Sequence, residues 1–209
     1  MKIKFCGIRR EKDIEYVNEL LPDYIGFVFA ESKRMVSIEQ AVLLRKKLDK
    51  RIKCVGVFVN EAPKNVLHIA EAVPLDVIQL HGDETAEYIS KIRAKSDSEI
   101  WKAVRVSSPE AVREAEKLDV DMLLLDSFSP SEYGGTGIPA NLSYIKEAGI
   151  KKSFFLAGGL NSENILESTK EVNPYGVDIS SGIETDGFKS KEKMLEIIKK
   201  LRQRGAENE

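Results

Sequence analysis

The feature that most constrains this chain is the regular alternation of short apolar runs with segments of helical periodicity. The apolar runs are rich in β-branched and aromatic residues and occupy residues 3–8, 24–29, 53–59, 77–80, 100–104, 122–125, 154–157 and 176–179. Such runs, mostly without strict alternation, are typical of strands buried on both faces of a parallel sheet. Helices are expected between them, at residues 11–21, 37–48, 63–72, 84–94, 109–118, 141–148, 162–170 and 189–201.

The number and length of these units narrow the fold class. Eight strand–helix units in 209 residues average about 26 residues each, close to the lower limit for a (β/α)8 barrel. Alternation of strand and helix favours parallel strands joined by right-handed crossovers. We therefore predict a single (β/α)8 TIM barrel over residues 1–209, with a polar tail from about residue 202. An open doubly wound sheet is the alternative, but it usually has fewer strands, and no GxGxxG follows the first run.

Composition excludes several classes of protein. With 32 basic and 34 acidic residues the net charge is −2, which argues against a nucleic-acid binder that works through a positive field. Cys6 and Cys54 are too few for a disulfide framework, and no CxxC or Cys/His cluster predicts a metal site. The N-terminus lacks the apolar stretch of a secretory signal, and no run approaches the roughly 20 apolar residues of a membrane span. We expect a soluble, cytoplasmic protein with neither nucleic-acid nor membrane partners.

Polar residues and glycines gather where the apolar runs end. In a (β/α)8 barrel the catalytic groups lie at the carboxyl ends of the strands. The candidates at these ends are Cys6, Arg34, Gln79, His81, Asp126, Gly158, Gly159, Asp178, Ser180, Ser181 and Gly182. A glycine-rich loop at residues 133–137 follows the sixth run.

The glycines after the seventh and eighth runs have a specific physical use. Gly158 and Gly159 allow backbone N–H groups to approach an anion, and residues 180–182 add donors. A short helix after the eighth run would direct its N-terminus inward. Barrel enzymes commonly bind phosphate at these two loops. Both segments are otherwise plain turns, but their positions favour a phosphate site.

Two further candidates suggest acid–base chemistry. A lone strand cysteine such as Cys6 is usually a small buried hydrophobe, and Asp126 is otherwise a loop-starting aspartate that bonds local backbone. Facing each other across a barrel mouth, they would form an acid–base pair, which requires a lowered thiol pKa and a raised carboxyl pKa. Arg34 is either a solvated surface charge or a fork for a substrate carboxylate. His68 has no assigned role, and Cys54 is expected to be structural.

The ordered set of motifs resembles the phosphoribosylanthranilate isomerase family. The matching pieces are KFCGI at 4–8, GFVF at 26–29, SKR at 32–34, GVFVN at 56–60, QLHG at 79–82, LD at 125–126, GGTG at 134–137, AGGL at 157–160 and VDISSG at 177–182. They extend from the first strand to the last, and the family is a (β/α)8 barrel. The stretch IPANL at 138–142 and Arg9 depart from the usual family pattern without touching the candidate acid or base.

The resemblance implies an Amadori rearrangement of N-(5-phosphoribosyl)anthranilate in tryptophan biosynthesis. By resemblance, Asp126 is the general acid that protonates the furanose oxygen, Cys6 is the general base that removes the C2 proton, and Arg34 binds the anthranilate carboxylate. The glycine and serine loops fall at the phosphate site, and Gln79, His81 and Asp178 count among the substrate-binding candidates. The intermediate iminium makes the C2–H acidic, so neither metal nor cofactor is expected. The oligomeric state is left open between monomer and homodimer.

Other functions remain open from the residues alone. A different (β/α)8 sugar-phosphate enzyme would share the phosphate loops: an epimerase would want metal-binding histidines, of which the chain has two, and a ring-closing synthase would want a lysine acid such as Lys102. A non-catalytic phosphometabolite binder is a second alternative. A thiol redox sensor built on Cys6 is a third, although no resolving cysteine is adjacent in sequence.

Overall fold

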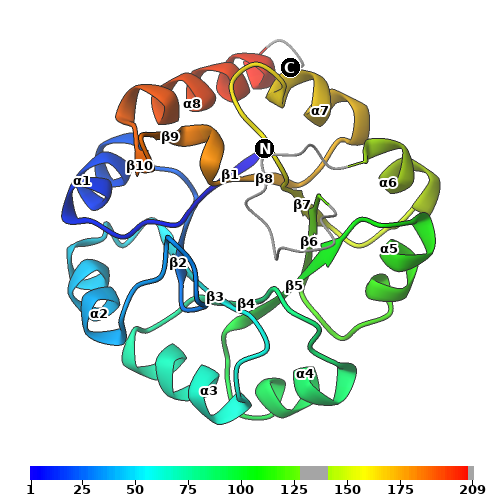
Figure 1. Cartoon of the computed structure of the whole chain (residues 1–209). Helices are drawn as coiled ribbons and strands as arrows, with labels where there is room; N and C mark the ends of the chain where they lie inside the picture. The colour runs from blue at the N-terminus through cyan, green and yellow to red at the C-terminus, as the bar shows by residue number, and fades with distance from the viewer. Residues whose placement is uncertain (128–140, 207–209) are drawn as a thin grey trace.

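Parallel strands close into a barrel in chain order, and helices form a ring around it (Figure 1). The computed structural model describes residues 1–127 and 141–206, with side chains as far as residue 203. The predictions for the loop at 133–137, for the family departure at 138–140 and for the tail at 207–209 lie outside these residues. In the described chain the barrel strands are β1 Lys2–Cys6, β2 Tyr24–Val28, β3 Lys53–Phe58, β4 Val77–Leu80, β5 Glu99–Arg105, β6 Met122–Asp126, β7 Phe154–Leu156 and β8 Gly176–Ile179.

Helices follow the strands as the sequence predicts. They are α1 Glu11–Leu20, α2 Ile38–Lys47, α3 Pro63–Ala72, α4 Ala86–Arg93, α5 Pro109–Glu116, α6 Leu142–Ala148, α7 Ile165–Val172 and α8 Lys191–Ala206. Several begin at the local signals for a helix start: Ser37, Thr85 and Ser108 accept hydrogen bonds from backbone N–H groups three residues on. The last helix continues to Ala206, past the predicted end at Leu201, because arginine and glutamine favour helix.

The barrel closes because β1 pairs with β8 in parallel, in register from Lys2 with Gly176 to Phe5 with Ile179. This closure confirms the (β/α)8 prediction and excludes the open doubly wound sheet, which would leave two edge strands. None of the helices in the described parts of the chain has the length and apolar character needed to cross a membrane.

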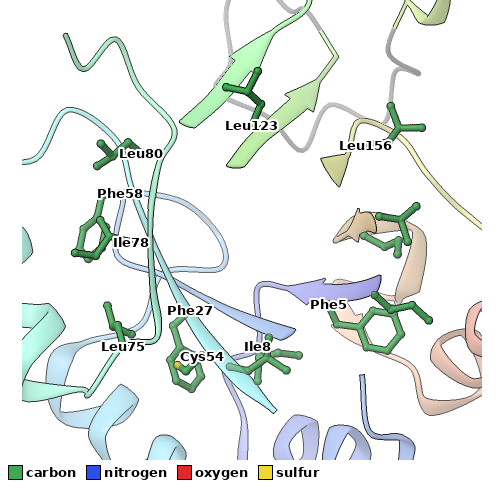
Figure 2. Packing of buried hydrophobic residues seen from close by; sticks show 14 of the residues in the cluster. Phe5, Ile8, Phe27, Cys54, Phe58, Leu75, Ile78, Leu80, Leu123 and Leu156 are labelled. Atoms are coloured by element: carbon green, nitrogen blue, oxygen red, sulfur yellow. The ribbon is translucent and has the colours of Figure 1, made fainter. Parts of the chain in front are cut away.

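Two apolar clusters hold the barrel. The larger one lies between the strands and the surrounding helices, and Figure 2 shows part of it, including Phe5, Phe27 and Phe58. The smaller one fills the barrel interior, where Trp101 stacks on Phe155 with centroids 4.6 Å apart and Tyr24 packs edge-on against both rings. All three residues start or lie near the start of their strands, so the rings fill the amino-terminal half of the barrel.

One element was not foreseen in the sequence. After β8 the chain forms a 3-10 turn at Ser181–Ile183, then a small hairpin of β9 Glu184–Thr185 and β10 Phe188–Lys189. The hairpin turn is Asp186–Gly187, both with positive φ (51° and 76°). Asp-Gly is the usual sequence of a two-residue turn of this kind, so the signal was present at residues 186–187. The 3-10 turn itself matches the short helix expected after the eighth run.

Candidate active site

A pocket of about 760 Å³ opens at the carboxyl ends of the strands, within the size range of small-molecule sites. The structure brings together ten of the candidate residues on its walls: Cys6, Arg34, Gln79, His81, Asp126, Gly158, Gly159, Asp178, Ser180 and Ser181. Gly182 does not line it. A Cβ at this position would lie 1.9 Å from the carbonyl oxygen of Leu160, so glycine is needed here for backbone packing between the turns after β7 and β8.

Cys6 is the last residue of β1 and is 8% exposed. Burial raises the pKa of its thiol, and the nearby Lys4 ammonium opposes that effect without cancelling it. The sequence-based requirement for a lowered thiol pKa is therefore wrong in direction for this structure. The physical reason is desolvation of a thiolate among apolar neighbours. Space for the sulfur comes from Gly26, where a Cβ would lie 2.8 Å from Sγ.

Asp126 ends β6, and both of its carboxyl oxygens take part in hydrogen-bonded contacts. Oδ1 accepts from the backbone N–H of Ser127 at 2.7 Å, and Oδ2 lies 3.2 Å from His81 Nε2. Gln79 Nε2 lies 2.9 Å from His81 Nδ1. With the amide nitrogen donating to Nδ1, the tautomer of His81 that fits both contacts carries its proton on Nε2 and donates it to Asp126. Asp126 thus accepts a hydrogen bond from the neighbouring backbone, and it also ends a row of hydrogen-bonded side chains that runs through His81 to Gln79.

Arg34 is not a solvated surface charge. Its Nε and Nη2 donate to the two carboxylate oxygens of Glu184, each at 2.8 Å, and Glu184 also accepts from Lys189 Nζ at 2.7 Å. Burial works against ionisation of Glu184, but Arg34 and Lys189 together lower its pKa to about 2. Lys189 donates in addition to the Ser180 carbonyl at 2.9 Å, so the network joins the loop after β2 to the loop after β8.

The two loops predicted to bind phosphate lie at the pocket wall. Gly158 and Gly159 have φ of 85° and 61°, a region that favours glycine. A Cβ on Gly158 would also lie 3.0 Å from Asp126 Oδ1, so this glycine makes room for the candidate acid. Ser180 Oγ donates to the Cys6 carbonyl at 3.2 Å and thereby ties β8 to β1.

Lys102 does not line the pocket. Its ammonium is buried and donates to the Gly82 carbonyl at 2.7 Å, the Ala103 carbonyl at 3.0 Å and Glu84 Oε2 at 3.1 Å. Burial lowers the pKa of Lys102 although Glu84 opposes this. A lysine held in this way supports the chain segment that carries His81, and it does not reach a ligand in the pocket as the acid of a ring-closing synthase would.

Three charged groups near the site were missed from the sequence: Lys4 and Lys189, which are buried, and Glu184, which is partly buried. Lysine and glutamate normally indicate solvent-facing positions, so their types give no signal of a buried role. For Lys4, however, the two-residue period of a strand does indicate a buried position, because Lys4 shares the inward face of β1 with Cys6. Cys54, by contrast, is fully buried in the outer cluster as expected.

In residues 1–127 and 141–206 no group of three His, Cys, Asp or Glu side chains forms an arrangement suited to a metal ion.

A closed (β/α)8 barrel that brings a thiol, a carboxyl group and two glycine-containing loops to one pocket at its carboxyl end belongs to the class of barrel enzymes acting on small metabolites. A family model described as N-(5'phosphoribosyl)anthranilate (PRA) isomerase matches residues 3–200. The chain belongs to this family, and it is accordingly an aldose–ketose isomerase of tryptophan biosynthesis.

Individual relatives agree with this assignment. The N-(5'-phosphoribosyl)anthranilate isomerase of Thermoanaerobacter sp. (strain X514) is 48% identical over 202 residues, covering 97% of this chain and 98% of the relative. The crystal structure of phosphoribosyl anthranilate isomerase from Thermus thermophilus has a TM-score of 0.88 at 31% identity and covers 98% of this chain and 100% of its own. A structure of the isomerase in complex with reduced 1-(o-carboxyphenylamino)-1-deoxyribulose 5-phosphate has a TM-score of 0.85 at 33% identity, with coverage of 97% and 99%.

Proposed function

We propose that this chain converts N-(5-phosphoribosyl)anthranilate into 1-(2-carboxyphenylamino)-1-deoxyribulose 5-phosphate with Asp126 as general acid and Cys6 as general base. The observation that supports these roles is that the two side chains line one pocket from β1 and β6. Acid–base isomerisation needs two proton-transfer groups that both reach a single substrate.

In the first step Asp126 gives its proton to the furanose oxygen, the C1–O bond breaks, and a C1–nitrogen iminium forms. Asp126 is left as a carboxylate. His81 Nε2–H and the Ser127 N–H both point at that carboxylate, and hydrogen bonds to the charged form favour proton release. His81 therefore assists the acid in the state that follows ring opening.

In the second step the Cys6 thiolate takes the C2 proton, and the C2–H electron pair moves to neutralise the iminium. The product is an enolamine, which tautomerises to the ketone by gaining a proton at C1 and losing one from the C2 hydroxyl. No net proton is consumed. Cys6 returns to the thiolate and Asp126 to the acid when protons exchange with solvent.

The substrate carries two anionic groups, a phosphate and a carboxylate, through which the protein can hold it in place. We assign the phosphate to the loops that contain Gly158, Gly159, Ser180, Ser181 and Gly182, the last through its backbone alone. The anthranilate carboxylate goes to Arg34, whose Nε–H and one Nη2–H already bind Glu184. The remaining guanidinium hydrogens are those available to a carboxylate, and the Glu184 pairing fixes the plane in which they lie.

The remaining two candidates act indirectly in this scheme. Gln79 contacts His81, and Asp178 pairs with Lys4 at 2.9 Å. We therefore assign to Gln79 the role of orienting the His81 imidazole. Asp178 balances the positive charge of Lys4, which lies near Cys6.

Substrate conversion can be followed by anthranilate fluorescence with purified wild type, Cys6→Ser and Asp126→Asn, all in EDTA. We expect wild-type turnover in EDTA and a loss of kcat of about 10²–10⁴ in each variant, the usual contribution of general acid–base catalysis. Cys54→Ala is the matched control, because it removes the other thiol, which lies in the outer cluster, and it should keep wild-type kcat.

Near-normal kcat in either site variant would contradict the assigned role. Wild-type activity that is lost in EDTA and restored by a metal ion would contradict the metal-free scheme. Tight substrate binding without turnover would favour the non-catalytic binder instead.

The proposal also covers the setting in which the protein works. We propose that the whole chain is one domain, that it acts in the cytoplasm on a small-molecule substrate without nucleic-acid or membrane partners, and that it is a monomer or a homodimer. Light scattering coupled to size-exclusion chromatography distinguishes a 23.4 kDa monomer from a dimer.

A further inference from the structure

Lys4 is a buried cation that the scheme above does not use. It lies two residues before Cys6 on β1, so both side chains point into the barrel. Lys4 is 0% exposed, and its Nζ lies 2.9 Å from Asp178 Oδ1 on β8. The same two residues are register partners in the β1–β8 ladder. A charged amine stays buried only where opposite charge compensates its lost hydration.

The sulfur of Cys6 lies close to this ion pair. The point where Gly26 would carry a Cβ is 2.8 Å from Cys6 Sγ and 3.4 Å from Lys4 Cε. The thiol and the end of the lysine side chain thus pack against the same spot on β2. No side chain separates them there, because residue 26 is glycine.

The other charged groups that act on the sulfur are already engaged. Lys189, from β10, donates to Glu184 and to the Ser180 carbonyl. Arg34, from the loop after β2, is held by Glu184. Lys4 has one ion-pair partner, Asp178, in the described chain, whereas Lys189 binds a carbonyl oxygen in addition to its one carboxylate.

We propose that Lys4 is a positioning residue for the isomerisation, which stabilises Cys6 as the thiolate that accepts the C2 proton, while Asp178 competes with the sulfur for the same ammonium. This inference rests on the proposed role of Cys6 as the base. The thiol proton leaves to solvent before the reaction, and Lys4 stays protonated throughout. When the sulfur takes the C2 proton it becomes neutral, and the ammonium is left with Asp178 alone.

The directions of the local pKa shifts are consistent with this arrangement. Burial raises the pKa of Cys6, Lys4 and Lys189 lower it, and Asp178 raises it. Burial opposes protonation of Lys4, but Asp178 and Cys6 outweigh it, so the pKa of Lys4 is raised. Lys4 is therefore a permanent positive charge next to a group that must become negative.

The test is the rate of alkylation of Cys6 by iodoacetamide as a function of pH, without substrate, with each cysteine quantified by mass spectrometry. The thiolate is the reactive form. Lys4→Met should raise the apparent thiol pKa by at least about one unit and slow alkylation at fixed pH by about tenfold or more. Asp178→Asn should do the opposite and speed it, because the ammonium then has the sulfur as its remaining partner.

Lys2→Met is the matched control. It removes a lysine from the same strand, but Lys2 is paired with Asp23 at an exposed position, so Cys6 reactivity should not change. A loosened barrel would accelerate alkylation of Cys54 along with Cys6, whereas the proposal changes Cys6 alone. If Lys4→Met fails to fold, the acceleration in Asp178→Asn still decides the matter.

An unchanged pH profile in Lys4→Met, or an unchanged or slower rate in Asp178→Asn, would overturn the proposal. With substrate, the rising limb of kcat/KM against pH should move upward in Lys4→Met in step with the alkylation profile. Failure of the base assignment itself is distinguishable: Cys6→Ser would then keep its turnover, whatever the alkylation rates show.

Discussion

Gly26→Ala should displace the candidate base by a calculable amount. Gly26 lies on β2 directly opposite Cys6 in the β1–β2 register. The added methyl carbon would lie 2.8 Å from Cys6 Sγ and 3.3 Å from Cys6 Cα. Comfortable non-bonded contact needs roughly 3.5–4.0 Å, so the sulfur has to move by about 1 Å.

A displacement of that size has different consequences for catalysis and for stability. Misplacing a reacting group by about 1 Å can cost about 10²-fold in rate. Overpacking of a well-filled interior typically costs about 1–3 kcal/mol in the free energy of unfolding. We expect kcat to fall roughly 10²-fold with little change in KM, because the atoms nearest to the added methyl group belong to Cys6 and Lys4 and not to the phosphate loops or Arg34.

The assay is steady-state fluorescence at saturating substrate, together with thermal unfolding. Gly56→Ala is the matched control: its Cβ would lie 2.3 Å from Leu75 Cδ1 and 2.9 Å from the Phe58 ring, in the outer cluster. Gly56→Ala should lose stability and keep kcat. Wild-type kcat in Gly26→Ala, or an equal loss of kcat in both variants, would refute the reasoning.

Two other predictions concern the charged network after β2 and β8. Arg34→Ala should lower kcat/KM by the value of a lost charged hydrogen bond, roughly 1.5–3 kcal/mol, and an unchanged kcat/KM would remove Arg34 from the site. Glu184 has a pKa of about 2 in the folded protein, below its ordinary value of 4.5, so the unfolded chain binds its proton first, and the stability that Glu184 contributes is lost as pH falls from about 4.5 to about 2. The free energy of unfolding of Glu184→Gln, measured at pH 6 and pH 3, should therefore fall less than that of wild type; an equal fall would contradict this.

Much of the fold could be predicted because strong local signals mark its boundaries. Strands β4 and β8 and helix α3 have the bounds that the sequence predicts, and α3 begins at a proline suited to the first helical turn. The first strand was predicted to reach Ile8 but ends at Cys6. Gly7 has a φ of 78°, which breaks the extended conformation, and a single glycine in an apolar run does not reveal its φ.

The candidate site could be predicted only in part. Residues that follow parallel strands share one end of the barrel, so Cys6, Asp126 and the glycine loops were expected together. Glu184, the partner of Arg34, lies 150 residues further along the chain. It belongs to a short hairpin that the pattern of apolar residues does not predict. The direction of the pKa shift of Cys6 could not be predicted from the sequence either, because it depends on how far the folded protein removes the thiol from water.

The rings of Tyr24, Trp101 and Phe155 fill the barrel interior on its amino-terminal side, and the pocket lies at the carboxyl ends of the strands. Trp101 and Phe155 are fully buried and Tyr24 nearly so, and all three belong to the apolar cluster that also contains Cys6. In the proposed scheme, substrate entry, product release and proton exchange at Cys6 and Asp126 all use the pocket that these two residues line, so a bound sugar delays that proton exchange until it leaves.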